Sequence, residues 1–169
     1  MFYACHTYYS LKYGTCKVET LVERSKELGI ESLVLTDINN TTGTYDFIRE
    51  CTLHDIKPVI GAEIRNGDTL LYSLIAKTYE AFAEINDFIS RHNLNKSIYP
   101  KPAPKFKNVY VIYPLSALSS DLSDNEFAAV HPYELSLIFN RIENGHKDKL
   151  LAFYPVTFCN TDEYEIHTH

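Results

Sequence analysis

Short apolar runs alternate with amphipathic stretches along the first third of the chain, and this alternation restricts the fold more than any other feature. The runs 2–7, 32–35 and 57–63 have the length and composition of buried β-strands. Between them, residues 17–28 and 44–53 carry apolar side chains at helical spacing. Strands that are joined by single helices form βαβ units, in which the strands pair in parallel. We therefore predict an α/β fold built on a parallel sheet.

Local signals mark the ends of several elements. Thr15 is the expected N-cap of the first helix, and Gly29 is expected just after its end, where a left-handed conformation suits glycine. A turn at 66–68 predicts that the third strand forms a hairpin with a fourth strand. Thr78 is the expected N-cap of the next helix. The other predicted elements are strands at 69–76, 108–113, 127–130 and 150–154, helices from 78 to about 91, at 132–142 and from 161 onward, and a proline-containing loop at 93–107.

Composition limits the classes of partner. A chain of 169 residues with 45% hydrophobic and 22% charged residues has the size and make-up of one globular domain, which excludes a disordered class. Its net charge of −6 makes it a poor stand-alone binder of DNA or of anionic membranes. No apolar run is long enough to span a bilayer, and no secretory signal opens the chain. We expect a cytoplasmic protein with no membrane partner.

The four cysteines carry no recognisable metal-binding or redox pattern. Cys5, Cys16, Cys51 and Cys159 are widely spaced, and none of them forms a CxxC pair. A domain of this size does not need disulfide bonds to be stable. We therefore expect all four to be reduced and to act as small hydrophobic core residues.

Polar residues at the ends of the first three predicted strands are the candidates for chemistry. His6, Asp37 and Glu63 follow consecutive strands, and the carboxyl ends of parallel strands lie at the same edge of a sheet. One imidazole and two carboxylates form a donor set that suits Zn²⁺ or Mn²⁺. The structural alternative stays open: Asp37 would cap the following helix, Glu63 would be solvated, and His6 would pack under a loop. Phosphate-binding loops, nucleophile elbows and dinucleotide fingerprints are absent from the sequence.

Several motifs in a fixed order resemble one known family, the polymerase and histidinol phosphatase (PHP) domain, in the version found at the N-terminus of bacterial DNA polymerase III alpha subunits. These motifs occupy residues 4–14, 21–29, 35–39 and 57–63, with a fainter similarity at 150–167. The resemblance implies a distorted (β/α)7 barrel that is similar to a TIM barrel and is here compact and incomplete. It also implies a metal cluster at the C-terminal face and, in active members, phosphoesterase or proofreading chemistry.

Compared with that family position by position, the chain lacks most of the metal ligands. The positions that carry a histidine or an acidic residue in the family are here Ala4, Tyr13, Ile38, Pro155 and Thr157. Alanine, isoleucine and proline side chains have no lone pair to offer a metal. The resemblance therefore implies a degenerate site, in which His6, Asp37 and Glu63 are residual ligands and no metal is expected to be bound.

The resemblance implies a role as well as a fold. We expect residues 1–169 to be a single PHP-like domain and an N-terminal part of a longer polymerase chain that continues after His169. Its partners would be the remainder of the alpha chain and the proofreading exonuclease subunit, and it would meet DNA only through the parent polymerase. This segment would not be catalytic by itself, although the parent chain would be a DNA-directed DNA polymerase.

Two other functional readings stay open. The first is a residual metal-dependent phosphoesterase that uses His6, Asp37 and Glu63 with Zn²⁺ or Mn²⁺. The second is an unrelated βα domain that binds a small ligand at the same strand ends. The missing ligands weigh against the first of these, and the order of the motifs weighs against the second.

Overall fold

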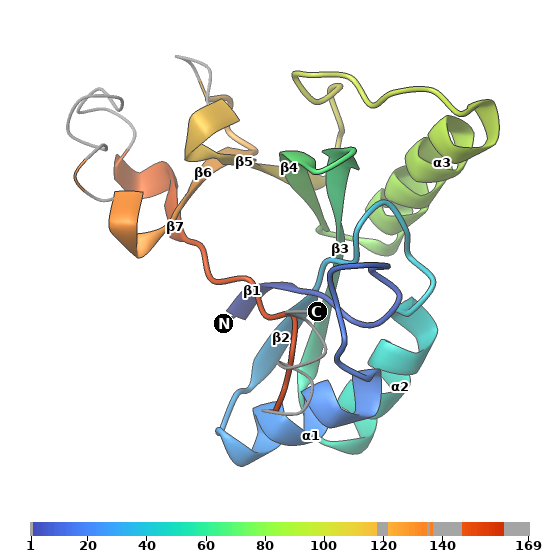
Figure 1. Cartoon of the computed structure of the whole chain (residues 1–169), viewed down its shortest axis with the longest axis vertical. Helices are drawn as coiled ribbons and strands as arrows, with labels where there is room; N and C mark the ends of the chain where they lie inside the picture. The colour runs from blue at the N-terminus through green and yellow to red at the C-terminus, as the bar shows by residue number, and fades with distance from the viewer. Residues whose placement is uncertain (1, 118–121, 135, 137–146, 161–169) are drawn as a thin grey trace.

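Seven strands form one curled sheet in which the spatial order of the strands follows the sequence (Figure 1). The structure is a computed structural model that describes residues 2–117, 122–134, 136 and 147–160. The strands are β1 (Phe2–Cys5), β2 (Ser32–Leu35), β3 (Lys57–Asn66), β4 (Thr69–Ala76), β5 (Val109–Pro114), β6 (Glu126–Val130) and β7 (Leu150–Ala152). The helices are α1 (Val18–Glu27), α2 (Thr44–Leu53) and α3 (Tyr79–Asn95), with short 3₁₀ turns η1 (Leu115–Ala117), η2 (Pro132–Glu134) and η3 (Lys147–Lys149). This curled, incomplete barrel confirms the predicted α/β fold class.

The direction of pairing changes twice across the sheet. β1, β2 and β3 are parallel, with α1 and α2 as the crossover helices. β3 and β4 form the predicted antiparallel hairpin, and β4 is also antiparallel to β5. β5, β6 and β7 are again parallel to one another. Because the first three strands run the same way, their carboxyl ends lie at one edge of the sheet, as the sequence predicts.

The segment that follows β7 returns to β1 and partly closes the curl (Figure 1). Val156 forms an isolated parallel bridge with Cys5. The Val156 amide donates to the Ala4 carbonyl, and the Val156 carbonyl accepts the His6 amide. One residue further on, the Thr157 carbonyl accepts the amide of Thr15. These bonds join two segments that are about as far apart in the sequence as the chain permits.

The same contact overturns one prediction about the cysteines. Cys16 and Cys159 form a disulfide bond, with their Cα atoms 5.7 Å apart and a separation of 143 positions in the sequence. Cys5 and Cys51 are free and buried, as expected. The error has a simple physical origin, because spacing along the chain carries no information about a pairing that depends on the return of the last segment to β1.

Apolar side chains form three clusters, two on the outer face of the sheet and one within the curl. The cluster between α1, α2 and the parallel strands includes Val22, Leu33, Leu35, Phe47 and Cys51. The cluster beneath α3 includes Ile64, Leu74, Ile85, Phe88 and Val109. The cluster inside the curl comprises Ala4, Val34, Ile75, Ile112, Ala129 and Phe153. Ala4 and the next residue, Cys5, therefore face opposite sides of the sheet, as alternation along a strand requires.

Helix ends and helix faces match the sequence predictions unevenly. The Thr78 hydroxyl accepts the Ala81 amide at 3.2 Å and Gly29 has φ +69°, which confirms both signals. The prediction for Thr15 is wrong, because Lys17 is the N-cap of α1 and makes no side-chain capping bond. The predicted helices at 132–142 and from 161 onward lie mostly outside the described residues. Across the part of the chain that is described, no helix has the length and apolar character needed to cross a bilayer.

Helical spacing in the sequence predicts that Tyr45, Ile48 and Cys51 form the core stripe of α2, and the structure differs at Tyr45. Tyr45 is 78% exposed, and Phe47 is buried in its place. Successive helical residues are rotated by about 100°, so these two side chains point in nearly opposite directions. The helix packs through Phe47 because α1 and the parallel strands both lie on that side.

Gly61 is a point where the sheet tolerates no side chain, and this supports a first prediction. A Cβ atom at Gly61 would lie 2.3 Å from the Leu74 carbonyl oxygen of the paired strand. We expect Gly61→Ala to lower the free energy of unfolding by about 1–3 kcal/mol, measured by urea denaturation. Gly67→Ala is the matched control, because Gly67 has φ +57° but open space around it, and its expected cost is about 1 kcal/mol. An equal or smaller cost at Gly61 would contradict the predicted steric contact.

Candidate functional site

All three predicted site residues are buried, but only His6 and Asp37 come after the ends of their strands, whereas Glu63 lies inside β3, which continues to Asn66 instead of ending at residue 63. His6 and Asp37 are each 1% exposed, and Glu63 has no exposed surface. The structural alternative of a solvated Glu63 is therefore wrong. Nε2 of His6 lies 3.2 Å from Oε2 of Glu63, so these two residues meet. Their assignment as metal ligands stays a prediction.

Asp37 makes a different set of contacts. Its Oδ1 accepts hydrogen bonds from the Thr7 amide and the Ser10 hydroxyl, both at 2.7 Å. Its Oδ2 accepts the Thr7 hydroxyl at 2.8 Å. The Asp37 carbonyl accepts the Glu63 amide at 3.1 Å, but within the described residues the hydrogen bonds of its carboxylate go to Thr7 and Ser10 and not to His6 or Glu63. The carboxylate of Asp37 thus ties the loop after β1 to the end of β2, and it does not cap α2, whose N-cap is Gly43.

The second partner of Glu63 is Arg65, a residue that the sequence analysis missed. Nε of Arg65 donates to Oε1 of Glu63, opposite the oxygen that faces His6. The carboxylate is therefore held between an imidazole and a guanidinium group. A signal was available in the sequence, since residues two apart on a strand face the same side of the sheet.

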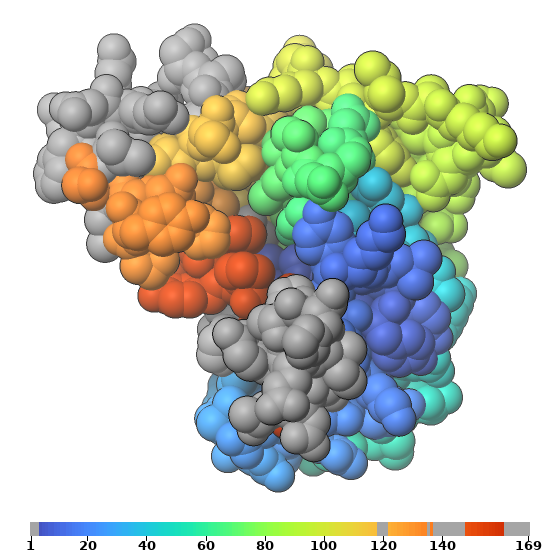
Figure 2. Space-filling view, viewed as in Figure 1, coloured from blue at the N-terminus to red at the C-terminus, as the bar shows by residue number. Residues whose placement is uncertain are grey.

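Two neighbours hold Arg65 in position. The side-chain amide of Asn39 accepts the Arg65 amide and donates to its carbonyl, with both distances 2.9 Å. The guanidinium carbon lies 4.3 Å from the centroid of the Tyr13 ring, and the Tyr13 hydroxyl donates to Asp68 at 2.9 Å. Figure 2 shows the loop after β1, in blue, against the turn between β3 and β4, in green, where this contact lies.

Burial and charge act in opposite directions on Glu63. Burial alone raises the pKa of a carboxyl group, because it penalises the charged form. The hydrogen bond and charge of His6, together with those of Arg65, outweigh burial and hold the pKa of Glu63 below its usual range. Glu63 is therefore an ionised, buried carboxylate that is neutralised within the protein.

The donor set does not fit the multi-metal cluster that the resemblance implies. Within the described ranges, no three histidine, cysteine, aspartate or glutamate side chains gather at a point that could hold a metal ion. Nδ1 of His6 and the hydroxyl of Ser73, which is paired with Glu63 across the hairpin, are buried without a hydrogen-bond partner. A buried water molecule would satisfy these two atoms. A metal cation is not needed to balance the charge of Glu63, because Arg65 already supplies a positive charge next to it.

The positions that depart from the family motif contribute packing and backbone contacts. Ala4 is buried among the apolar residues inside the curl. Ile38 forms an isolated parallel bridge with Glu63 through its backbone. Tyr13 stacks on Arg65, and Thr157 bonds the Thr15 amide through its carbonyl.

Comparison with known proteins adds an independent line of evidence. The family model described as "PHP domain" matches residues 3–150. DNA polymerase III subunit alpha of Helicobacter pylori is 45% identical over 67 residues, which cover 38% of this chain and 6% of that protein. The error-prone DNA polymerase of Symbiobacterium thermophilum is 29% identical over 122 residues, which cover 69% of this chain and 11% of that protein. The chain thus matches only a small part of the length of these curated relatives.

A solved structure with a similar fold comes from Bifidobacterium adolescentis. It is described as a metal-dependent phosphoesterase, and it matches 94% of this chain and 87% of its own chain with a TM-score of 0.52. The sequence identity is 13%, so the match concerns the fold alone.

Proposed function

Because the chain belongs to the PHP domain family, we propose that it acts as the N-terminal PHP domain of a DNA polymerase III alpha subunit, with a structural and protein-docking role. The relatives that support this role are replicative and error-prone polymerases. In this proposal the domain has a degenerate metal site and does not catalyse a reaction by itself.

The ion pair of Glu63 with Arg65 is the observation that carries the proposal. A buried carboxylate needs a compensating positive charge, because burying it alone is costly. In a metal-dependent relative a metal cation can provide that charge. Here Arg65 provides it from the same strand, with a side chain that is 15% exposed next to a carboxylate that is fully buried.

Arginine can take the place of a metal cation beside Glu63, and it also prevents a metal from binding there. The guanidinium group stays protonated throughout the physiological pH range and has no lone pair to offer a metal. Its flat face also stacks on Tyr13, at a position where the family carries an acidic residue. Arg65, held against the Tyr13 ring, therefore supplies the positive charge beside Glu63, which favours a stable fold without a metal.

The same proposal assigns the partners. The remainder of the alpha chain and the proofreading exonuclease subunit are the proposed protein partners, in the cytoplasm. Nucleotidyl transfer and DNA binding would belong to the parent polymerase, which agrees with the net charge of −6 on this segment. Co-purification of the full chain with a separately expressed remainder of the alpha subunit tests the docking role, and the absence of a stable complex would contradict it.

A residual phosphoesterase is the second candidate, and one observation favours it. Nδ1 of His6 is buried and has no hydrogen-bond partner, so it keeps a free lone pair in one tautomer. A metal bound to this nitrogen would also need Glu63 as a ligand, but the Glu63 carboxylate already forms an ion pair with Arg65.

A metal titration separates the two candidates and supplies a second prediction. We expect Mn²⁺ and Zn²⁺ to show no stoichiometric binding to the full chain by calorimetry, and purified protein to contain no metal by elemental analysis. We also expect no metal-dependent hydrolysis of p-nitrophenyl phosphate. One tightly bound metal that is lost in His6→Ala but kept in the control His54→Ala would overturn the degenerate-site proposal.

A further inference from the structure

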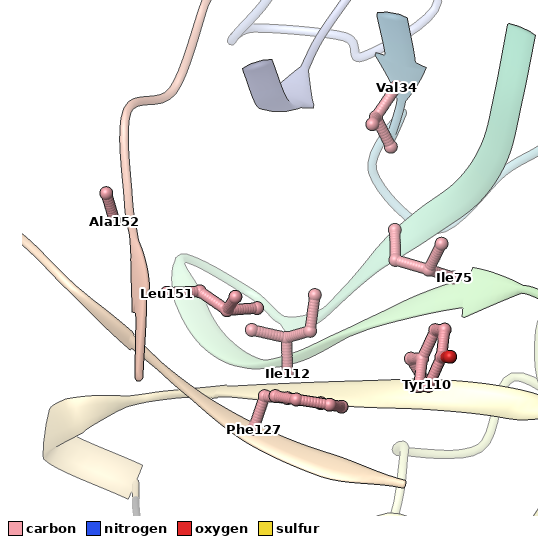
Figure 3. A pocket seen from close by; sticks show the side chains of 7 residues that line it. All are labelled: Val34, Ile75, Tyr110, Ile112, Phe127, Leu151 and Ala152. Carbon is pink, nitrogen blue, oxygen red and sulfur yellow. The ribbon is translucent and has the colours of Figure 1, made fainter. Parts of the chain in front are cut away.

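An apolar cavity of about 300 Å³ lies inside the curl of the sheet, and neither His6 nor Glu63 is among its lining residues. Its walls come from β2, from the end of β4 and from β5, β6 and β7. The lining residues are Val34, Ile75, Tyr110, Ile112, Phe127, Leu151 and Ala152. Figure 3 shows side chains from both sides of the curl around one open space. Its volume is roughly twice that of a ~150 Å³ cavity that binds benzene.

Two lysines lie at one edge of this cavity. Lys77 comes directly after β4 and Lys149 is the last residue of η3, so each lies next to a strand that contributes a lining residue, Ile75 and Leu151. Nζ of Lys77 lies 3.9 Å from the centroid of the Tyr110 ring.

The second ammonium lies over the neighbouring ring of the cavity wall. Nζ of Lys149 is 5.7 Å from the centroid of Phe127. Tyr110 and Phe127 pack edge to face with their centroids 5.4 Å apart. Each of these two adjacent aromatic rings of the wall therefore has a lysine ammonium group beside it.

Both ammonium groups donate hydrogen bonds to the same short segment, residues 123–125, which precedes β6. Lys77 donates to the side-chain oxygen of Asn125, and Lys149 donates to the carbonyl of Ser123, two residues earlier. Each ammonium has three N–H donors, so each keeps donors beyond these bonds. The result is an apolar cavity with two cationic groups at one edge, in a chain whose net charge is −6.

We propose that this cavity binds a small amphipathic carboxylate, with its aliphatic body against Ile75, Ile112 and Leu151 and its carboxylate at Lys77 and Lys149. The apolar wall favours a hydrocarbon body, and the two ammonium groups favour one negative charge at the edge. A neutral hydrocarbon would leave the lysines without a ligand partner, and a cationic amphiphile would be repelled by them. This site is separate from the His6–Glu63–Arg65 cluster and does not depend on the docking role.

Calorimetric titration of the full chain with decanoate tests the proposal. We expect saturable binding at one site, with weaker binding of decanol and none of decyltrimethylammonium, which has the same chain with the opposite charge. Lys77→Gln and Lys149→Gln should each weaken decanoate binding by roughly 10-fold, the loss of one charge-assisted hydrogen bond. Lys101→Gln, in an exposed loop, is the control and should leave it unchanged.

A second variant tests the cavity itself. Ala152 lies exposed at the edge of the cavity, so Ala152→Phe adds volume there without disturbing a buried contact, and it should abolish decanoate binding. Equal binding of decanoate and decyltrimethylammonium, or binding that survives both lysine variants and Ala152→Phe, would overturn the proposal. The absence of any decanoate binding to the unmodified chain would overturn it as well.

Discussion

Replacement of Arg65 by methionine is expected to lower the free energy of unfolding by about 3–5 kcal/mol. Methionine keeps much of the aliphatic volume but removes the charge, which leaves the fully buried carboxylate of Glu63 with His6 as its single partner. Denaturation with urea at neutral pH measures the loss. The effect is large because an uncompensated buried charge costs more than a lost contact.

A second substitution separates the charge effect from the loss of packing on Tyr13. Glu63→Gln in the Arg65→Met background should recover much of the lost stability, because it removes the charge that Arg65 balances. Arg65→Lys should give an intermediate loss, since lysine keeps the charge but cannot stack as a flat group. A loss below about 1 kcal/mol for Arg65→Met would contradict the view that Arg65 neutralises the site.

Asp37→Ala is expected to lower the free energy of unfolding by about 3 kcal/mol, although none of the residues that the structure describes forms an ion pair with Asp37. The substitution leaves the Thr7 amide, the Thr7 hydroxyl and the Ser10 hydroxyl without their acceptor in a buried region. Urea denaturation again measures the loss, which should be the same with and without added Mn²⁺.

Asp37→Asn is the matched control, because it keeps the shape and one carbonyl oxygen but removes the charge. We expect it to lose about half as much stability as the alanine variant. If Mn²⁺ stabilised the unmodified chain but not Asp37→Ala, the residue would act as a metal ligand, and the structural role inferred from its hydrogen bonds would be wrong.

The regular elements were predictable because their signals are local. The predicted bounds of β2, α2 and β4 match the structure residue for residue. An apolar run between turn residues, or apolar residues at helical spacing, depends on neighbours within a few positions. The face that each helix buries was less predictable, as Tyr45 shows, because that choice depends on what packs against the helix.

The candidate site was predictable only in part. Parallel pairing was enough to place His6 and Glu63 at the same edge of the sheet, and the two residues meet there. Asp37 lies at that edge too, yet its side chain bonds to Thr7 and Ser10. Strand order specifies the edge of the sheet at which a residue lies. The rotamer and the conformation of the adjacent loop determine the direction of its side chain.

The sequence by itself determined the α/β class and the hairpin, because local spacing controls these properties, and its resemblance to the PHP domain predicted the loss of metal ligands. Tertiary structure alone decided that Arg65 neutralises Glu63, that Cys16 pairs with Cys159, and that two lysines lie at the edge of one cavity. Each of these contacts depends on a rotamer or on chain segments that meet only after folding. Burial then strengthens the contact between Arg65 and Glu63, since little water competes for the two charges.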